Sequence, residues 1–159
     1  MRLARLLLLT AAALAACPDA RADATLFLGT SSGPSNRGNR GFALGAGLLV
    51  VGFEFEYGHA VEDLPEGSPS LHTGMGNVLI QTPVAIFGLQ PYFTTGGGVY
   101  RESFNSRSET NFAVNTGGGA KISLFGPLRA RVDYRVFRLR GSPIEDVVQR
   151  LYVGANLKF

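Results

Sequence analysis

The sequence predicts an all-β fold, an eight-stranded antiparallel up-and-down transmembrane β-barrel preceded by a cleaved signal peptide. Apolar residues alternate with polar or small ones in segment after segment, which places the apolar side chains on one face of each strand. No long stretch repeats apolar residues at the helical period of 3.6. The 21 glycines, 11 phenylalanines and 5 tyrosines are typical of a strand-rich chain.

The N-terminal residues have the layout of a secretory leader. The basic start Met1–Arg5 is followed by an apolar run over 6–16 and then by Ala20-Arg21-Ala22, which predicts a signal peptide at 1–22 and a mature domain at 23–159. The apolar run is too short for a spanning helix. Leu14–Cys17 also resembles a lipoprotein signal, so lipidation of Cys17 stays open as an alternative. Cys17 is the only cysteine, so the predicted mature domain can form no internal disulfide.

The charge of the mature domain argues against nucleic acid as a partner. Three of the 15 basic residues and one of the 12 acidic residues fall in the leader, so the remainder is nearly neutral. No cluster of Lys and Arg with interleaved aromatic residues appears.

Eight strands are expected in chain order, separated by polar or glycine- and proline-containing segments. The strands are predicted at 24–30, 40–48, 51–58, 72–82, 90–100, 111–124, 128–136 and 151–159. Long polar loops are expected at 31–39, 61–71, 101–110 and 140–149, and short connections at 49–50, 83–89 and 126–127. The apolar parity changes between Val50 and Val51, which predicts a tight turn at 49–50 although Leu49 and Val50 are not turn residues. The triplets 96–98 and 117–119 are all glycine and fall within strands, where they are expected to relieve crowding.

The last strand and the rhythm of the loops carry a family resemblance. In 151–159 (LYVGANLKF), Leu151, Val153, Ala155, Leu157 and Phe159 share one face. Nine residues tilted by about 40° span the ~25 Å apolar band of a transmembrane barrel. Alternating long and short connections, an even strand count and a terminal Phe resemble the outer-membrane β-barrel domain family of small bacterial barrels, over essentially all of 23–159.

This resemblance implies a location and a set of partners. A protein of this family lies in the cell outer membrane of a Gram-negative-type envelope, in contact with outer-membrane lipids. Its C-terminal strand is an assembly signal for the barrel-assembly machinery, here carried by Leu151, Val153, Leu157 and Phe159. No extracellular partner can be named, and no cofactor is expected.

Charged residues occupy the face opposite the aromatic residues. In a membrane barrel they would line the lumen and form a charge network, for which we expect the acids Glu54, Glu56 and Asp133 and the bases Lys121, Arg129, Arg131 and Arg135. In a soluble barrel the same face would be outside. Aromatic girdles are expected from Tyr57, Tyr92, Tyr100, Tyr134 and Phe159.

The sequence predicts no catalytic, cofactor or metal site. The only histidines, His59 and His72, are expected to be solvated residues at the ends of the second long loop, and neither begins a His-x-Ser pattern. We therefore expect a non-enzymatic outer-membrane barrel with a structural or surface-interaction role, acting through four extracellular loops. Two alternatives stay open, namely a lipid-modifying enzyme on the same scaffold and a soluble periplasmic ligand-binding barrel.

Overall fold

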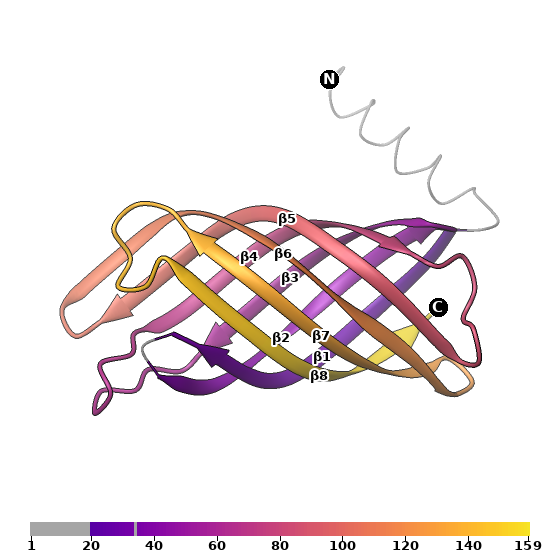
Figure 1. The fold of residues 1–159 in the computed structure, drawn as a ribbon, viewed down its shortest axis with the longest axis horizontal. Helices are drawn as coiled ribbons and strands as arrows, with labels where there is room; N and C mark the ends of the chain where they lie inside the picture. Colours follow the sequence, from indigo (N-terminus) through magenta and orange to yellow (C-terminus); the bar gives the residue numbers. More distant parts are fainter. Residues whose placement is uncertain (1–19, 34) are drawn as a thin grey trace, which may run out of the picture.

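The computed structural model describes residues 20–33 and 35–159, which form a closed barrel of eight antiparallel strands (Figure 1). The strands are β1 (Ala20–Ser32), β2 (Asn36–Leu48), β3 (Val51–Ala60), β4 (Ser70–Gln81), β5 (Leu89–Phe104), β6 (Arg107–Phe125), β7 (Leu128–Leu139) and β8 (Val147–Lys158). Each strand pairs with its neighbours in sequence, and β1 pairs with β8. The predicted fold class is confirmed.

Most of the predicted signal peptide, residues 1–19, lies outside the described residues. Ala20, Arg21 and Ala22 are described and already belong to β1, where they pair with Leu48, Gly47 and Ala46 of β2. The boundary between residues 22 and 23 and the lipidation of Cys17 stay predictions.

The barrel has two different ends. Ala22 and Phe159 exchange backbone hydrogen bonds of 3.0 and 2.9 Å at one end, here called the terminal end, which also carries the connections 49–50, 82–88 and 126–127. The connections 61–69, 105–106 and 140–146 lie at the other end, the loop end, together with Ser32 and Asn36, the facing ends of β1 and β2. The β5–β6 hairpin projects there beyond its neighbours (Figure 1).

The predicted rhythm of long and short loops was partly wrong. Segments 31–39 and 101–110 are mostly paired strand, because Ser31 lies opposite Arg37 and Glu102 opposite Glu109. Polar side chains do not prevent backbone pairing where the hairpin stands outside an apolar layer. The connection 82–88 is longer than a minimal turn. The tight turn at 49–50 is confirmed, with Leu49 in the left-handed region at φ 49°.

The outer surface of the barrel wall is apolar, and most of the inner surface is polar, apart from a buried apolar cluster toward the loop end. Leu26, Phe53 and Val153 are 71%, 61% and 60% exposed, whereas Glu56, Arg131 and Arg135 are fully buried. This arrangement is opposite to that of a soluble barrel, which buries its apolar face, and it therefore argues against the soluble periplasmic alternative. Among the residues that the structure describes, no helix is long and apolar enough to cross a membrane.

The predicted aromatic girdles were only partly correct. Tyr57, Tyr134 and Phe159 lie on the outer surface, but Tyr92 and Tyr100 are 6% and 1% exposed and point into the barrel. Their hydroxyl groups have polar partners inside: that of Tyr92 contacts Asp133, and that of Tyr100 donates to the Arg140 carbonyl oxygen at 2.5 Å. A buried tyrosine needs such a partner.

The glycine triplets lie within β5 and β6, as predicted, and one of them shows why glycine is required. A Cβ atom at Gly98 would lie 2.0 Å from the carbonyl oxygen of Gly74 on the neighbouring strand. Backbone of β4 therefore occupies the space that any side chain would need.

Candidate functional site: the charged barrel interior

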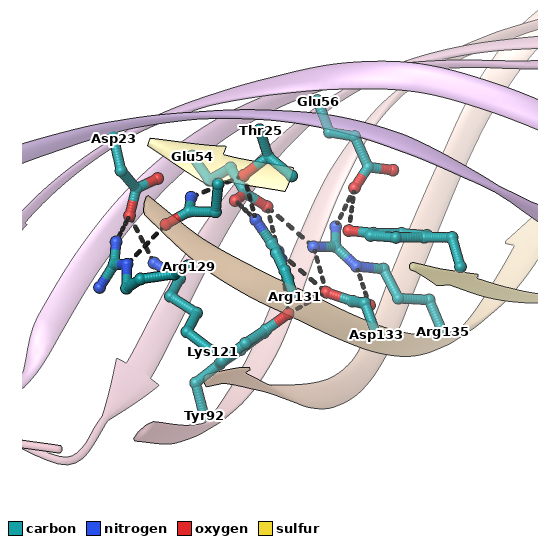
Figure 2. Close-up of polar contacts among 12 residues, drawn as sticks. Asp23, Thr25, Glu54, Glu56, Tyr92, Lys121, Arg129, Arg131, Asp133 and Arg135 are labelled. Atoms are coloured by element: carbon teal, nitrogen blue, oxygen red, sulfur yellow. Dashed lines mark hydrogen bonds and ion pairs between the residues drawn. The ribbon is translucent and has the colours of Figure 1, made fainter. Parts of the chain in front are cut away.

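The centre of the lumen holds an ion-paired cluster contributed by β3 and β7. Arg131 contacts Glu54 through both terminal nitrogens and lies 2.9 Å from Asp133. Arg135 donates to Glu54 at 2.8 Å and to Asp133 at 2.9 Å (Figure 2). These two arginines are buried completely. Two carboxylates thus bridge two guanidinium groups that would otherwise repel each other.

Glu56 bridges a second pair of arginines, nearer the loop end. Arg135 and Arg150 lie directly opposite each other on β7 and β8, a pairing of like charges that destabilises a sheet unless it is neutralised. Glu56 lies 3.0 Å from Nη1 of Arg135, an ion pair without hydrogen-bond alignment, and accepts a hydrogen bond of 3.1 Å from Arg150. The Tyr152 hydroxyl donates to the other carboxylate oxygen at 3.0 Å.

A third cluster lies toward the terminal end and is centred on Asp23. Lys121 and Arg129 lie 2.5 and 3.0 Å from the same oxygen of this carboxylate (Figure 2). Arg129 also donates to Asn156 at 2.7 Å and to Gln90 at 3.2 Å. This cluster joins β1 to β6 and β7, on different sides of the lumen.

Together the three clusters fill the cross-section of the barrel. A cavity of about 30 Å³ lies at the terminal end beside Asp23, Lys121 and Arg129, which is room for one or two water molecules. Arg131, Arg135 and Arg150 have no exposed surface. An eight-stranded barrel is only wide enough to be filled by its own side chains. This interior is filled by charged and hydrogen-bonded side chains and, toward the loop end, by a buried apolar cluster that includes Leu71, Met75 and Phe137.

The structure places all seven residues of the expected lumen network on the inner face, but it divides them differently from the expectation. Glu54, Asp133, Arg131 and Arg135 meet, whereas Arg129 and Lys121 contact Asp23. The expectation of one network that joins Arg129 to Glu54 and Glu56 was therefore wrong. Arg129 lies nearer the terminal end of β7 than Arg131 does, and Asp23 lies at that end of β1.

The lumen network expected from the sequence did not include Asp23, Tyr92, Arg150 or Tyr152, all of which contact its members. Arg150 was assigned to the edge of a loop, yet it continues the inward parity of Tyr152 and Asn156, so extending the alternation by one step would have found it. Asp23 has the same parity as Thr25 and Phe27 on β1. Tyr92 donates to Asp133 and accepts a 2.7 Å hydrogen bond from Arg131. No local signal distinguishes this role from that of a girdle tyrosine.

The two histidines are not loop residues. His59 of β3 and His72 of β4 are opposite each other in register, face outward near the loop end and stack with ring centroids 4.2 Å apart. His72 lies in the predicted strand 72–82, whereas β3 continues two residues beyond the predicted strand 51–58 and so includes His59. The expectation of solvated residues at the ends of a loop was therefore wrong, because the two rings stack on the barrel wall. Nδ1 of His72 lies 2.8 Å from the Tyr57 hydroxyl. Within residues 20–33 and 35–159, no group of three or more His, Cys, Asp or Glu residues could hold a metal ion.

A closed eight-stranded barrel with an apolar outside and an ion-paired inside is the architecture of a small outer-membrane β-barrel, and solved structures have the same fold. Neisserial surface protein A aligns with a TM-score of 0.71 and 12% identity, covering 89% of this chain and 97% of that one. The N-terminal β-barrel domain of Pseudomonas aeruginosa OprF aligns with a TM-score of 0.66 and 16% identity, covering 87% and 97%. Ail of Yersinia pestis aligns with a TM-score of 0.53 and 14% identity, covering 90% and 100%.

These likenesses confirm the resemblance at the level of the fold, which is consistent with the outer membrane. No model of a known protein family matches the chain, and no curated relative matches it.

Proposed function

We propose that this protein is a non-enzymatic outer-membrane barrel that acts at the cell surface through its loop end. The observation that carries the proposal is the ion-paired interior. Because buried side chains fill the lumen, most of them charged or hydrogen-bonded, and lipid would cover the apolar wall, neither offers a soluble partner a binding surface. The projecting loop end supplies one.

The β5–β6 hairpin is the largest feature of the loop end (Figure 1). Its strands stay paired up to Phe104 and Arg107, and several hydrogen bonds tie it to the 140–146 connection. Arg107 donates to the Ser142 carbonyl oxygen at 3.0 Å, and the Ile144 amide donates to Glu102 at 3.0 Å. A paired and tethered hairpin loses less conformational entropy on binding than a free loop, which suits a recognition element.

The proposal fixes the orientation of the barrel. The loop end faces the exterior, and the terminal end faces the periplasm, where the strand containing Leu151, Val153, Leu157 and Phe159 would serve the assembly machinery.

Cysteine labelling tests this orientation. The only native cysteine, Cys17, lies in the predicted leader. Ser106→Cys at the tip of the β5–β6 hairpin should react with a membrane-impermeant maleimide in intact cells. Ala85→Cys, exposed in the 82–88 connection, should react only after the outer membrane is permeabilised. Labelling of Ala85→Cys alone in intact cells would reverse the orientation.

The contacts of the histidines favour this function over a lipid-modifying enzyme. An enzyme of that type needs a base beside a nucleophile, and the contacts that the structure gives His59 and His72 are with each other and with Tyr57. His59→Ala and His72→Ala should leave the lipid composition of the outer membrane unchanged when the protein is overproduced. A lipid product that is lost in either variant would favour the enzyme.

A further inference from the structure

Among the outward-facing residues of the eight strands, the charged residues are all basic and all lie near the loop end. Along the described strands, these positions include Arg40, Arg101 and Arg138, all near the loop end, and they include no Asp or Glu. The rest of the outer wall is apolar or uncharged. The charge is therefore concentrated where the apolar wall meets the membrane surface.

Four of the outward-facing residues form a row across the wall. Arg40 of β2 lies opposite His59 of β3, His59 lies opposite His72 of β4, and His72 lies opposite Arg101 of β5. We call these four residues the cationic row. At about 4.8 Å between strands, its two arginines are about 14 Å apart along the wall.

The arginines of this row form no ion pair with any acid that the structure describes. Among the ion pairs of residues 20–33 and 35–159, none includes Arg40 or Arg101. Arg101 only donates to the Ser108 hydroxyl, at 3.3 Å. This contrasts with the interior, where Arg131, Arg135 and Arg150 each contact a carboxylate. Both row arginines are exposed and keep their donors for an external anion.

The histidines are also placed to donate a hydrogen bond to an external anion. The Tyr57 hydroxyl lies 2.8 Å from Nδ1 of His72. When this hydroxyl donates, the neutral imidazole carries its proton on Nε2, which leaves an N–H donor on the far side of the ring. His59 stacks on His72 and keeps the two rings parallel within 12°.

An apolar groove runs down the wall from the Arg40 end of the row. It has a volume of about 860 Å³, in the range of sites that hold small molecules, and crosses β8, β1, β2 and β3. Leu26, Leu28, Phe42, Tyr57, Val153 and Ala155 line it, and Arg40 and His59 stand at its end nearest the loops. The groove is thus apolar along its length and cationic at its mouth.

We propose that the groove and the cationic row bind one lipid with a phosphate headgroup, with an acyl chain along the groove and the phosphate against Arg40, His59, His72 and Arg101. The charge complementarity identifies this occupant, because a guanidinium group matches the oxygen atoms of a phosphate and the lined groove matches a hydrocarbon chain. The site lies near the membrane surface, where a lipid-facing arginine lowers the stability of a membrane barrel only slightly. The inference rests on the proposed membrane location and adds a specific lipid to it.

The test compares two lipids that differ only in the phosphate. The full-length barrel, folded in detergent micelles, is mixed with phosphatidic acid or with diacylglycerol of the same acyl chains, and native mass spectrometry measures the fraction with lipid bound. We expect phosphatidic acid to bind about tenfold more tightly, the effect of one charge-assisted hydrogen bond. Equal binding of the two lipids would overturn the proposal.

Matched variants separate the two parts of the site. Arg40→Gln with Arg101→Gln should reduce phosphatidic acid binding to the level of diacylglycerol, whereas Arg138→Gln, outward-facing at the same end but on β7, should have no effect. Ala155→Phe fills the groove without changing its charge and should weaken the binding of both lipids. Ala120→Phe, on the outer face of β6, should weaken the binding of neither. Equal losses in site variants and controls would contradict the proposal.

Further outcomes distinguish other occupants. Glycerol 3-phosphate should not displace phosphatidic acid at equal concentration, and displacement would assign the row to a free phosphate. A dimer that Ala155→Phe abolishes would assign the groove to a second copy of the chain. Heat-modifiable gel migration confirms folding of each variant. If the double variant does not fold, phosphatidic acid binding by the single variant Arg101→Gln serves as the test. A further result is a barrel that shows no preference for phosphatidic acid while Ser106→Cys reacts with the maleimide in intact cells. That result would refute this inference and leave the proposed function intact.

Discussion

Neutralising Glu56 should destabilise the barrel strongly, because no other carboxylate of the described residues contacts the fully buried Arg150. Glu56→Gln keeps the volume of the side chain and removes its charge. The change leaves Arg135 and Arg150, directly opposite each other and without exposed surface, with no carboxylate between them. It also replaces the acceptor of the Tyr152 hydroxyl, 3.0 Å away.

The magnitude follows from these contacts. Removing one partner of a buried ion pair costs about 3 to 5 kcal/mol, because the remaining charge stays in a medium of low dielectric constant. Arg135 keeps Glu54 and Asp133 as partners, but the only carboxylate that contacts Arg150 among the described residues is Glu56. We therefore expect a loss of about 3 kcal/mol or more in the free energy of unfolding, most of it from Arg150.

Urea unfolding in lipid vesicles measures this loss. The chain has no tryptophan, so the transition is followed by far-ultraviolet circular dichroism and by the folded fraction on unheated gels. Glu66→Gln, exposed in the 61–69 connection, should change the stability by less than about 0.5 kcal/mol. The double change Glu56→Gln with Arg150→Gln should be less destabilising than the sum of the single changes. A Glu56→Gln barrel within about 0.5 kcal/mol of the wild type would refute the reasoning.

Four further predictions test the wall, the lumen, the strand packing and the barrel closure. Val132→Arg, on the outward face of β7, should cost about 2 to 4 kcal/mol in vesicles, and a neutral effect would invert the two faces. The purified monomer should give no stable large-conductance channels in planar bilayers, since the lumen is filled, and such currents would contradict the filled interior. Gly98→Ala should lower the urea midpoint because its Cβ would overlap the Gly74 carbonyl, whereas Gly74→Ala, whose nearest contact is 4.0 Å, should not; equal midpoints would refute this difference. Deleting Phe159 should reduce the folding yield, because its backbone exchanges two hydrogen bonds with Ala22, and an unchanged yield would remove support for its role in closure and assembly.

Alternation along each strand was sufficient to assign the faces. Glu54 and Arg131 share their parity with small or polar residues, and Phe53 and Val132 with apolar ones, so the face of each residue follows from the two-residue repeat of a strand. The strand count and the turn at 49–50 followed from the same repeat. The ends of the strands did not, because backbone pairing can continue through polar residues such as Ser31 once a hairpin leaves the apolar layer.

Only the tertiary structure decided which interior residues meet. The sequence by itself determined that the chain alternates between an apolar and a charged face, that eight such strands follow one another, and that Arg129, Arg131 and Arg135 share one face of β7. It did not determine that Arg129 pairs with Asp23 while Arg135 pairs with Glu54, because partners across a lumen are set by the tilt and stagger of the closed barrel. The same geometry turns Tyr92 inward and aligns Arg40, His59, His72 and Arg101 in one row. Those neighbours come from four different strands, so no local pattern in the chain specifies their contact.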